Sequence, residues 1–369
     1  MHIRPVESNS DLKAFLQFPY DHYKDDPVWV PLLRFDQRKA FNPRKNAFLD
    51  HCTYQLFLLE KDGKLIGRIA AFIDHVAMDY WGERIGLFGY YECVQDPEAG
   101  SLLLETARDW LLDKGCTRMR GPWSFVSQEW GSVVEGFTPS PVIMGPYNPP
   151  YYNEDYAAFG LEKVQDMLCW YIDGAEYEIP ERIMHLTDAI AKRYKVRIRH
   201  MNIKDYDNEV KHILALSNNS IIDNWGYSPV TDAEAQSMAD DLRLVAQERG
   251  VIFAEDEHGE VIGFAIALPD INVLLKGGDG RLFPFGIFKL LYGLPRLTRF
   301  RMFALGVVPE YQGKAVDSLI YRALYESVYS KDMWMEINYV LEDNWPMVNA
   351  IKKLNATPLR RYRVFEMEI

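Results

Sequence analysis

The residues best suited to chemistry lie between Leu305 and Ile320. An apolar run ends there in Pro309-Glu310, and a small-residue loop leads into a stretch with helical periodicity from Ala315 to Tyr329. A strand that passes through a tight loop into a helix start directs several unpaired backbone N–H groups at one point. Such a point binds a phosphate or pyrophosphate well. The order of elements therefore predicts an anion-binding loop over Gln312-Gly313-Lys314-Ala315-Val316.

This loop resembles the acyl-CoA loop of GNAT-type N-acyltransferases, whose usual pattern is Gln/Arg-x-x-Gly-x-Gly/Ala. The match is good from Gln312 to Ala315 and poor at Asp317. Two like unit charges about 4 Å apart repel by roughly 1 kcal/mol in water and about 4 kcal/mol at a surface-like dielectric. An acid in the first helical turn also suits the helix dipole. We expect a working loop with Asp317 turned away, and a weakened or lost site is the alternative.

The two halves of the sequence repeat one plan, which indicates a tandem duplication. Each half has a hairpin with a charged, glycine-containing turn, then an aromatic strand, and then an amphipathic helix. These are 57–71, 85–93 and 101–114 in the first half, and 252–266, 300–308 and 318–329 in the second. The resemblance implies an α/β protein of two tandem GNAT-like domains, 1–175 and 176–369. Each domain would have a mixed, mostly antiparallel sheet flanked by helices.

The halves differ in what they keep of the GNAT pattern. GNAT proteins often carry a tyrosine, and four residues later a glycine, in the last helix. The first half keeps Tyr156 and Gly160, but its loop at Gln95–Gly100 carries two acids and lacks the Gln-Gly-Lys run. The second half keeps the loop but has Ile351 at the tyrosine position. The resemblance therefore implies a degenerate first domain, with acetyl-CoA or a longer acyl-CoA bound by the second.

N-acyl transfer needs oxyanion donors, a base for the amine and an exit for the thiolate. The resemblance implies that the backbone N–H groups of Val307 and Val308 polarise the thioester carbonyl. Glu336 is the candidate base, although an exposed strand acid is the simpler interpretation. Tyr339 or water is the candidate acid, since a thiol pKa near 8.5 makes the thiolate a ready leaving group. Asn344 would bind the pantetheine arm or serve as a plain N-cap.

An aromatic loop, Ile222–Pro229, precedes a helical stretch, Asp232–Gln247. GNAT proteins use this region as a lid over the acceptor, so Trp225 and Tyr227 are candidate substrate-binding residues. The plainer interpretation is that both rings pack the loop against its own domain.

The bulk composition narrows the function classes. A net charge of −12 argues against general nucleic-acid binding, which needs a basic surface. The eight histidines show no metal-ligand spacing, and the four cysteines form no Cys-x-x-Cys pair, so no metal is expected. The N-terminus has no apolar signal-peptide core. We expect a cytoplasmic protein with a small-molecule or lipid amine as acceptor, and the oligomeric state stays open.

The segment 281–301 is basic and aromatic inside an acidic chain, with five cations and no acid. Such a stretch is typical of a peripheral contact with the membrane surface. The alternative is a helix packed on its own domain, with its charges paired to acidic residues.

The architecture as a whole resembles a bacterial group of tandem GNAT proteins, some of which are linked to N-acylation of sphingoid bases. That resemblance implies acyl transfer to an amine and points to a lipid acceptor. Two alternatives remain. One is a FemABX-like aminoacyl transferase, and the net charge of −12 argues against it. The other is a non-catalytic acyl-CoA sensor, which Asp317 and Ile351 favour.

Overall fold

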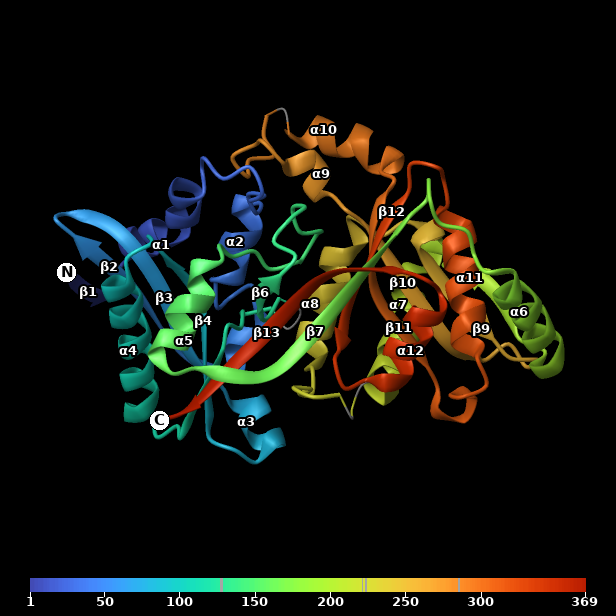
Figure 1. The fold of residues 1–369 in the computed structure, drawn as a ribbon, viewed down its shortest axis with the longest axis horizontal. Coiled ribbons are helices and arrows are strands. Elements are labelled where there is room, and N and C mark those ends of the chain that lie inside the picture. The colour runs from blue at the N-terminus through green and yellow to red at the C-terminus, as the bar shows by residue number, and fades with distance from the viewer. Residues whose placement is uncertain (127–128, 221, 223, 285) are drawn as a thin grey trace. The chain divides into compact units, whose positions relative to one another are not determined.

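The computed structural model describes residues 1–126, 129–220, 222, 224–284 and 286–369. The chain forms two compact units that are interleaved in the sequence (Figure 1). Unit 1 comprises Met1–Asp166, Leu275–Ile287 and Arg360–Ile369, and unit 2 comprises Met167–Leu274 and Phe288–Leu359. The sequence-based boundary at 175/176 divides the chain by order alone, whereas two later segments return to unit 1.

Unit 1 has a mixed sheet in the order β1-β2-β3-β4-β5-β13, with β6 paired to β13. Only β4 and β5 run parallel among these neighbours. Its strands are β1 (His2–Pro5), β2 (Cys52–Lys61), β3 (Lys64–Asp74), β4 (Ile85–Cys93), β5 (Arg118–Gly121), β6 (Ser132–Glu135) and β13 (Thr357–Glu368). Its helices are α1 (Asn9–His22), α2 (Arg34–Ala40), η1 (Ala47–His51), α3 (His75–Trp81), α4 (Pro97–Asp113) and α5 (Tyr151–Phe159).

Unit 2 repeats this arrangement in the order β7-β12-β11-β10-β9-β8, and again one pair, β11 and β12, runs parallel. Its strands are β7 (Glu162–Asp173, from Met167 on), β8 (Arg197–His200), β9 (Val251–Glu255), β10 (Val261–Pro269), β11 (Arg299–Val307) and β12 (Trp334–Leu341). Its helices are α6 (Glu181–Tyr194), α7 (Tyr206–Ser220), α8 (Asp232–Arg243), α9 (Asn272–Leu275), α11 (Val316–Val328) and α12 (Trp345–Lys353).

Short helical turns complete the chain: η2 (Ile203–Asp205), η3 (Glu248–Gly250), η4 (Leu294–Arg296) and η5 (Pro309–Tyr311). Helix α10 (Gly286–Gly293) crosses from the unit 1 segment into unit 2. The matching sheets confirm the predicted tandem α/β fold. In the described part of the chain, no helix is both long and apolar enough to cross a bilayer.

The hairpin between β2 and β3 shows how local sequence sets this fold. Asp62 and Gly63 both have positive φ, at 51° and 72°. Two consecutive residues with positive φ match the type I′ turn, whose twist suits a two-residue hairpin. Glycine adopts this conformation freely and aspartate tolerates it. The charged turn predicted from the sequence therefore lies where the strands reverse.

The final strand of the chain, β13, lies in the sheet of unit 1, where Phe365 to Glu368 pair with β5. It is fixed there by Asp166, whose carboxylate is 0% exposed. Arg363 donates to it from Nε at 2.8 Å and from Nη2 at 3.0 Å, and Arg361 donates at 3.1 Å. A buried carboxylate that is paired with two guanidinium groups is satisfied in both charge and hydrogen bonding.

Candidate functional site

The two central strands of unit 2 separate after a short paired stretch. Arg299–Met302 of β11 lie opposite Trp334–Ile337 of β12 in parallel register. Both strands then continue, to Val307 and to Leu341, while the described β11–β12 ladder ends at Met302. Beyond this point the facing edges carry backbone groups that the described β11–β12 ladder does not pair.

A β-bulge marks the point of separation. Ile266 of β10 pairs with Ala304, whereas the next residue, Ala267, pairs with Met302. Phe303 is therefore one extra residue in β11. A bulge bends its strand and increases the local twist, and bulges are frequent beside active sites.

The ladder with β10 decides which amides of β11 face the separation. The Val308 N–H donates to the Ile262 carbonyl at 2.9 Å. Hydrogen-bonded and non-hydrogen-bonded pairs alternate along an antiparallel ladder, so the amides of Val307 and Leu305 point away from β10. Of the two predicted oxyanion donors, the Val307 N–H thus points toward the separation. The Val308 N–H is already hydrogen-bonded to β10.

The predicted anion-binding loop has the backbone that such a loop requires. Gly313 and Ala315 both have positive φ, at 71° and 59°. Ala315 is also the N-cap of α11, and its methyl group cannot accept a hydrogen bond from the helix amides. A Cβ on Gly313 would meet no atom within 4 Å, so the loop is open on that side. Left-handed turns of this kind, placed before a helix start, form anion-binding concavities.

Two side chains of the loop have defined places. Gln312 donates from Nε2 to the Val307 carbonyl at 3.0 Å, which ties the loop to the end of β11. The Lys314 ammonium lies 4.6 Å from the centre of the Tyr311 ring and 5.4 Å from that of Tyr194. These cation–π contacts hold a positive charge beside the loop. Val316, the last of the predicted loop residues, is fully buried as the first residue of α11.

Asp317 follows in the first turn of α11 and is partly buried. Burial raises the pKa of its carboxyl group, and the N–H groups of Ser318 and Asp317 itself, together with Lys353, partly offset this effect. The carboxyl group thus interacts with amides at the helix start, where an anionic ligand would bind. A raised pKa makes neutralisation of this acid easier, which would lessen its repulsion of a phosphate.

The candidate base Glu336 is fully buried, at 0% exposure. Its neighbours Met335 and Ile337 belong to the core formed with α6 and α11. Side chains alternate along a strand, so Glu336 and Asn338 project to the other face of the sheet. The Asn338 amide donates to Glu336 Oε1 at 2.8 Å. The expectation of an exposed strand acid is therefore wrong.

Arg301, which the sequence analysis did not place in the site, lies directly opposite Glu336 in the β11–β12 register. It is 2% exposed, and its guanidinium lies 5.1 Å from the centre of the Tyr339 ring. We call Arg301, Glu336, Asn338 and Tyr339 the buried polar cluster. The signal in the sequence is an arginine between Phe300 and Met302, both core residues of the strand.

The expected lid, Ile222–Pro229, joins α7 to α8, and residues 221 and 223 lie outside the described residues. Helix α7 packs on β10 and β11. Trp225 and Tyr227 are both partly buried, and the Tyr227 N–H donates to the Asn224 carbonyl at 3.1 Å. The helical stretch predicted to reach Gln247 ends at Arg243.

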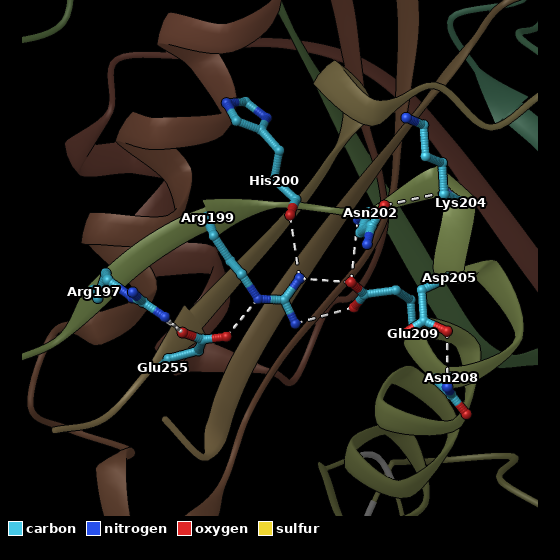
Figure 2. A network of polar contacts seen from close by, with 9 residues as sticks. All are labelled: Arg197, Arg199, His200, Asn202, Lys204, Asp205, Asn208, Glu209 and Glu255. Carbon is cyan, nitrogen blue, oxygen red and sulfur yellow. Dashed lines mark hydrogen bonds and ion pairs between the residues drawn. The ribbon is translucent and has the colours of Figure 1, made fainter. Parts of the chain in front are cut away.

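A polar network ties the start of α7 to the edge of the sheet (Figure 2). Arg199 of β8 forms a bidentate pair with Glu209 of α7, at 2.8 and 3.0 Å, and also bonds Glu255 of β9. The Asn202 N–H donates to the same Glu209 at 3.1 Å. Bidentate arginine–carboxylate pairs add geometric specificity to their energy. The first turn of the helix that precedes the lid is thereby attached to β8 and β9.

The last helix provides no tyrosine. Ile351 is 0% exposed and belongs to the unit 2 core. Asn344 caps α12, because its Oδ1 accepts the Met347 N–H at 3.2 Å. The side-chain oxygen of Asn344 therefore acts as a plain N-cap.

Unit 1 brings together a group that the sequence analysis did not identify. His51, Cys52 and Asp74 offer potential metal ligands within 4.8 Å of one another. His51 Nδ1 lies 3.0 Å from Asp74 Oδ1, which also accepts the Ala77 N–H as the cap of α3. These hydrogen bonds account for the arrangement.

No protein-family profile matches the sequence. Over 375 residues the chain is 32% identical to the protein YghO of Escherichia coli K12, which covers all of this chain and 95% of that protein. It is 31% identical over 384 residues to the bacterial ceramide synthase of Caulobacter vibrioides, covering 99% and 97%.

Solved structures agree on the fold. A tandem GNAT protein from the clavulanic acid biosynthesis pathway superimposes with a TM-score of 0.59 at 14% identity, over 100% of this chain and 98% of the other. A GCN5-related glucosamine N-acetyltransferase region of a fungal enzyme also gives 0.59 at 14% identity, over 99% of this chain and 38% of the other. The chain therefore belongs to the family of YghO and the Caulobacter bacterial ceramide synthase, and it has the tandem GNAT fold.

Proposed function

We propose that this protein is an N-acyltransferase that moves an acyl group from an acyl-CoA to an amine, with the thioester bound by unit 2. The observation that carries the proposal is the separation of β11 from β12 beside the loop that begins α11. The loop offers helix amides and Lys314 to the pyrophosphate. The separated edge of β11 offers amides to the pantetheine arm and the thioester.

The reaction follows from this arrangement. The Val307 N–H donates to the thioester oxygen as negative charge develops on it, which stabilises the tetrahedral intermediate. The amine nitrogen forms the new C–N bond, and Glu336 takes its proton directly or through one water. The C–S bond then breaks, and CoA leaves as a thiolate. Tyr339 or water supplies its proton, and the low pKa of a thiol makes a dedicated acid dispensable.

We further propose that the acceptor is a long-chain amine and the donor a long-chain acyl-CoA. This part rests on the relative named bacterial ceramide synthase, 31% identical over nearly the whole chain. Within unit 2, Trp225 and Tyr227 of the lid would cover the acceptor. Asn338, which bonds Glu336, would keep the base oriented toward the amine.

Release of free CoA thiol tests the proposal. The purified protein is incubated with acyl-CoAs of graded chain length and either a long-chain amino alcohol or a short amine. We expect thiol release that requires an amine, is fastest with the long-chain pair and gives an amide by mass spectrometry. Thiol release without amide would contradict acyl transfer, and equal rates with short substrates would contradict the lipid acceptor.

A non-catalytic acyl-CoA sensor is the second candidate. The buried Ile351 in place of the family tyrosine and the acid Asp317 favour it. This candidate predicts acyl-CoA binding with no turnover for any amine, so amide formation would eliminate it.

A further inference from the structure

Helix α10 exposes large apolar side chains on its outer face. Phe288 is 56% exposed, Leu291 62% and Tyr292 69%. Leu290, on the side of the helix away from Phe288 and Tyr292, is only partly exposed, as is Ile287. A helix with apolar residues all round is normally buried, and a surface helix normally has a polar outer face. The outer face of α10 therefore has the composition of a surface that is covered in use.

The segment that follows α10 is anchored by contacts within unit 2. Gln247 donates from Nε2 to the Leu294 carbonyl at 2.9 Å, and Arg249 donates from Nη2 to the Leu297 carbonyl at 3.0 Å. A Cβ on Gly293 would lie 2.6 Å from Leu274 Cδ2, so the helix end packs closely on α9. The exposed side chains are thus presented by a segment anchored at its C-terminal end.

The charged residues of the segment 280–301 are all basic. From Gly280 to Arg301 the chain has five basic residues and no acid, although the whole protein carries −12. Lys289 and Arg296 are exposed beside the apolar side chains. Arg281, just before the helix in the sequence, is exposed and pairs with Asp279 at 3.0 Å.

The other two basic residues are not available to a surface ligand. Arg299 pairs with the buried Asp270 at 2.8 Å and lies 3.9 Å from the centre of the Trp334 ring. Arg301 is part of the buried polar cluster and is 2% exposed. The expectation of five cations at a lipid surface is therefore wrong for Arg301, and Arg299 is engaged by Asp270 and Trp334.

We infer that Phe288, Leu291 and Tyr292, flanked by Lys289 and Arg296, form an interfacial surface that binds an anionic lipid bilayer. The apolar side chains would enter the boundary between headgroups and acyl chains, and the two cations would contact lipid phosphates. A twofold contact with a second copy suits this surface less well, because it would bring the cations of both copies together. The inference does not depend on the proposed acyl transfer.

Because two or three cations are exposed instead of five, apolar insertion is the larger contribution. Binding should weaken with salt, but only moderately, since each cation contributes little and is screened within a Debye length. Removal of the apolar side chains should therefore reduce binding more than removal of the charges.

Vesicle co-sedimentation of the full chain tests this, using phosphatidylcholine vesicles with and without about one third phosphatidylglycerol. One variant carries Phe288→Ser, Leu291→Ser and Tyr292→Ser, and another carries Lys289→Gln and Arg296→Gln. Matched controls change exposed residues of unit 1: Tyr80→Ser with Leu112→Ser, and Lys45→Gln with Lys64→Gln. Thermal unfolding and gel filtration establish that each variant is folded and report its oligomeric state.

We expect binding to the anionic vesicles, a loss of roughly tenfold or more in the partition coefficient for the apolar variant, and a smaller loss for the charge variant. Both controls should bind like the unaltered protein. Failure of the unaltered protein to bind anionic vesicles at low salt would overturn the inference. So would a dimer that the apolar variant converts to a monomer, because the surface would then be a protein interface.

Discussion

The two units share a fold but treat the separation of their central strands differently. In unit 1, the described ladder between β4 and β5 runs from Ile85 to Leu87, and the chain after β5 stays in contact with β4. The Trp123 N–H donates to the Phe88 carbonyl, and the Phe125 N–H to the Tyr90 hydroxyl, both at 2.8 Å. A Cβ on Gly89 would lie 1.7 Å from the Trp123 carbonyl oxygen. Unit 1 thus fills with its own backbone the position beside β4, whereas the described β11–β12 ladder of unit 2 ends at Met302.

The helices that follow these strands, α4 in unit 1 and α11 in unit 2, also differ in whether their first amides are capped. Asp96 caps α4, where it accepts the Glu98 and Ala99 N–H groups at 3.2 and 3.5 Å and pairs with Lys61 at 3.0 Å. A carboxylate at a helix start occupies the amides that would otherwise bind a phosphate. Helix α11 begins instead with Ala315, which has no such group. The two helix starts thus differ by a few local residues on one shared fold.

The largest effect should come from Glu336→Gln. If the chemistry takes place in unit 2, loss of the base should lower kcat by roughly 10²–10⁴ and leave the acyl-CoA Kd nearly unchanged. Amide formation in quenched, timed assays gives kcat, and calorimetric titration gives the acyl-CoA Kd.

Glu92→Gln is the matched variant in unit 1, because Glu92 is paired there with the buried Arg68. It should lower Tm while the remaining folded protein keeps its kcat. A Glu336→Gln enzyme at full speed, or a Glu92→Gln enzyme without activity, would reverse the assignment of the two units.

A smaller effect should come from the loop of unit 2. Gly313→Val places a β-branched residue at φ 71°, which costs on the order of 1–2 kcal/mol, and it displaces the amides that face the anion. We expect the CoA Kd to rise at least roughly tenfold, as read by titration calorimetry. Glu98→Ala in the equivalent turn of unit 1 should leave this Kd unchanged, and an equal loss in both variants would remove the distinction between the loops.

Asp317→Asn should strengthen CoA binding by several-fold, because it removes a carboxylate from the anion-binding helix start. The raised pKa of Asp317 sets the pH dependence. The repulsion is complete above this pKa and is lost as the acid becomes protonated at lower pH. The CoA affinity of the unaltered protein should therefore rise toward that of the variant on acidification. A variant that binds CoA more weakly at neutral pH would show that Asp317 supports the site.

The smallest effect concerns the last strand of unit 1. Burial alone would raise the pKa of Asp166, but hydrogen bonds from Arg363 and Arg361 lower it below its usual 3.8. A lowered folded-state pKa gives stability that is fully present above pH 3.8 and is lost as the pH falls through the folded-state value. Asp166→Asn should cost roughly 2 kcal/mol near neutral pH, a shift of a few degrees in Tm.

The pH profile of Tm separates this pair from general acid unfolding. On acidification below pH 3.8, the unaltered protein should lose Tm more steeply than Asp166→Asn. Parallel profiles would mean that the Asp166 pair makes no net contribution to stability.

The sequence was sufficient for those features that local pattern determines. Apolar runs around charged, glycine-containing turns predicted the hairpins, and the Gln-Gly-Lys run predicted the loop before α11. The repeat of this order in both halves predicted the tandem fold. The catalytic role of Glu336 remains a prediction.

Features that depend on pairing between distant segments could not be predicted from the sequence. Arg301 and Glu336 are separated by the whole of α11, and only the β11–β12 register brings them opposite each other. The Phe303 bulge depends on the match between β10 and β11, which no single strand encodes. In the same way, the basic residues of 281–301 look alike in the sequence. Only the start of β11 at Arg299 distinguishes the two arginines that belong to the sheet from the exposed residues of α10.

The position of β13 has a consequence for how the protein is made. The sheet of unit 1 needs residues Arg360–Ile369, which are synthesised after the whole of unit 2. Domains usually fold in the order of their synthesis, but here the N-terminal unit must wait with the edge of β5 uncovered until these residues have been made. An uncovered strand edge is a template for aggregation. Ribosome stalling or loss of the C-terminus should therefore harm the first half of the protein at least as much as the second.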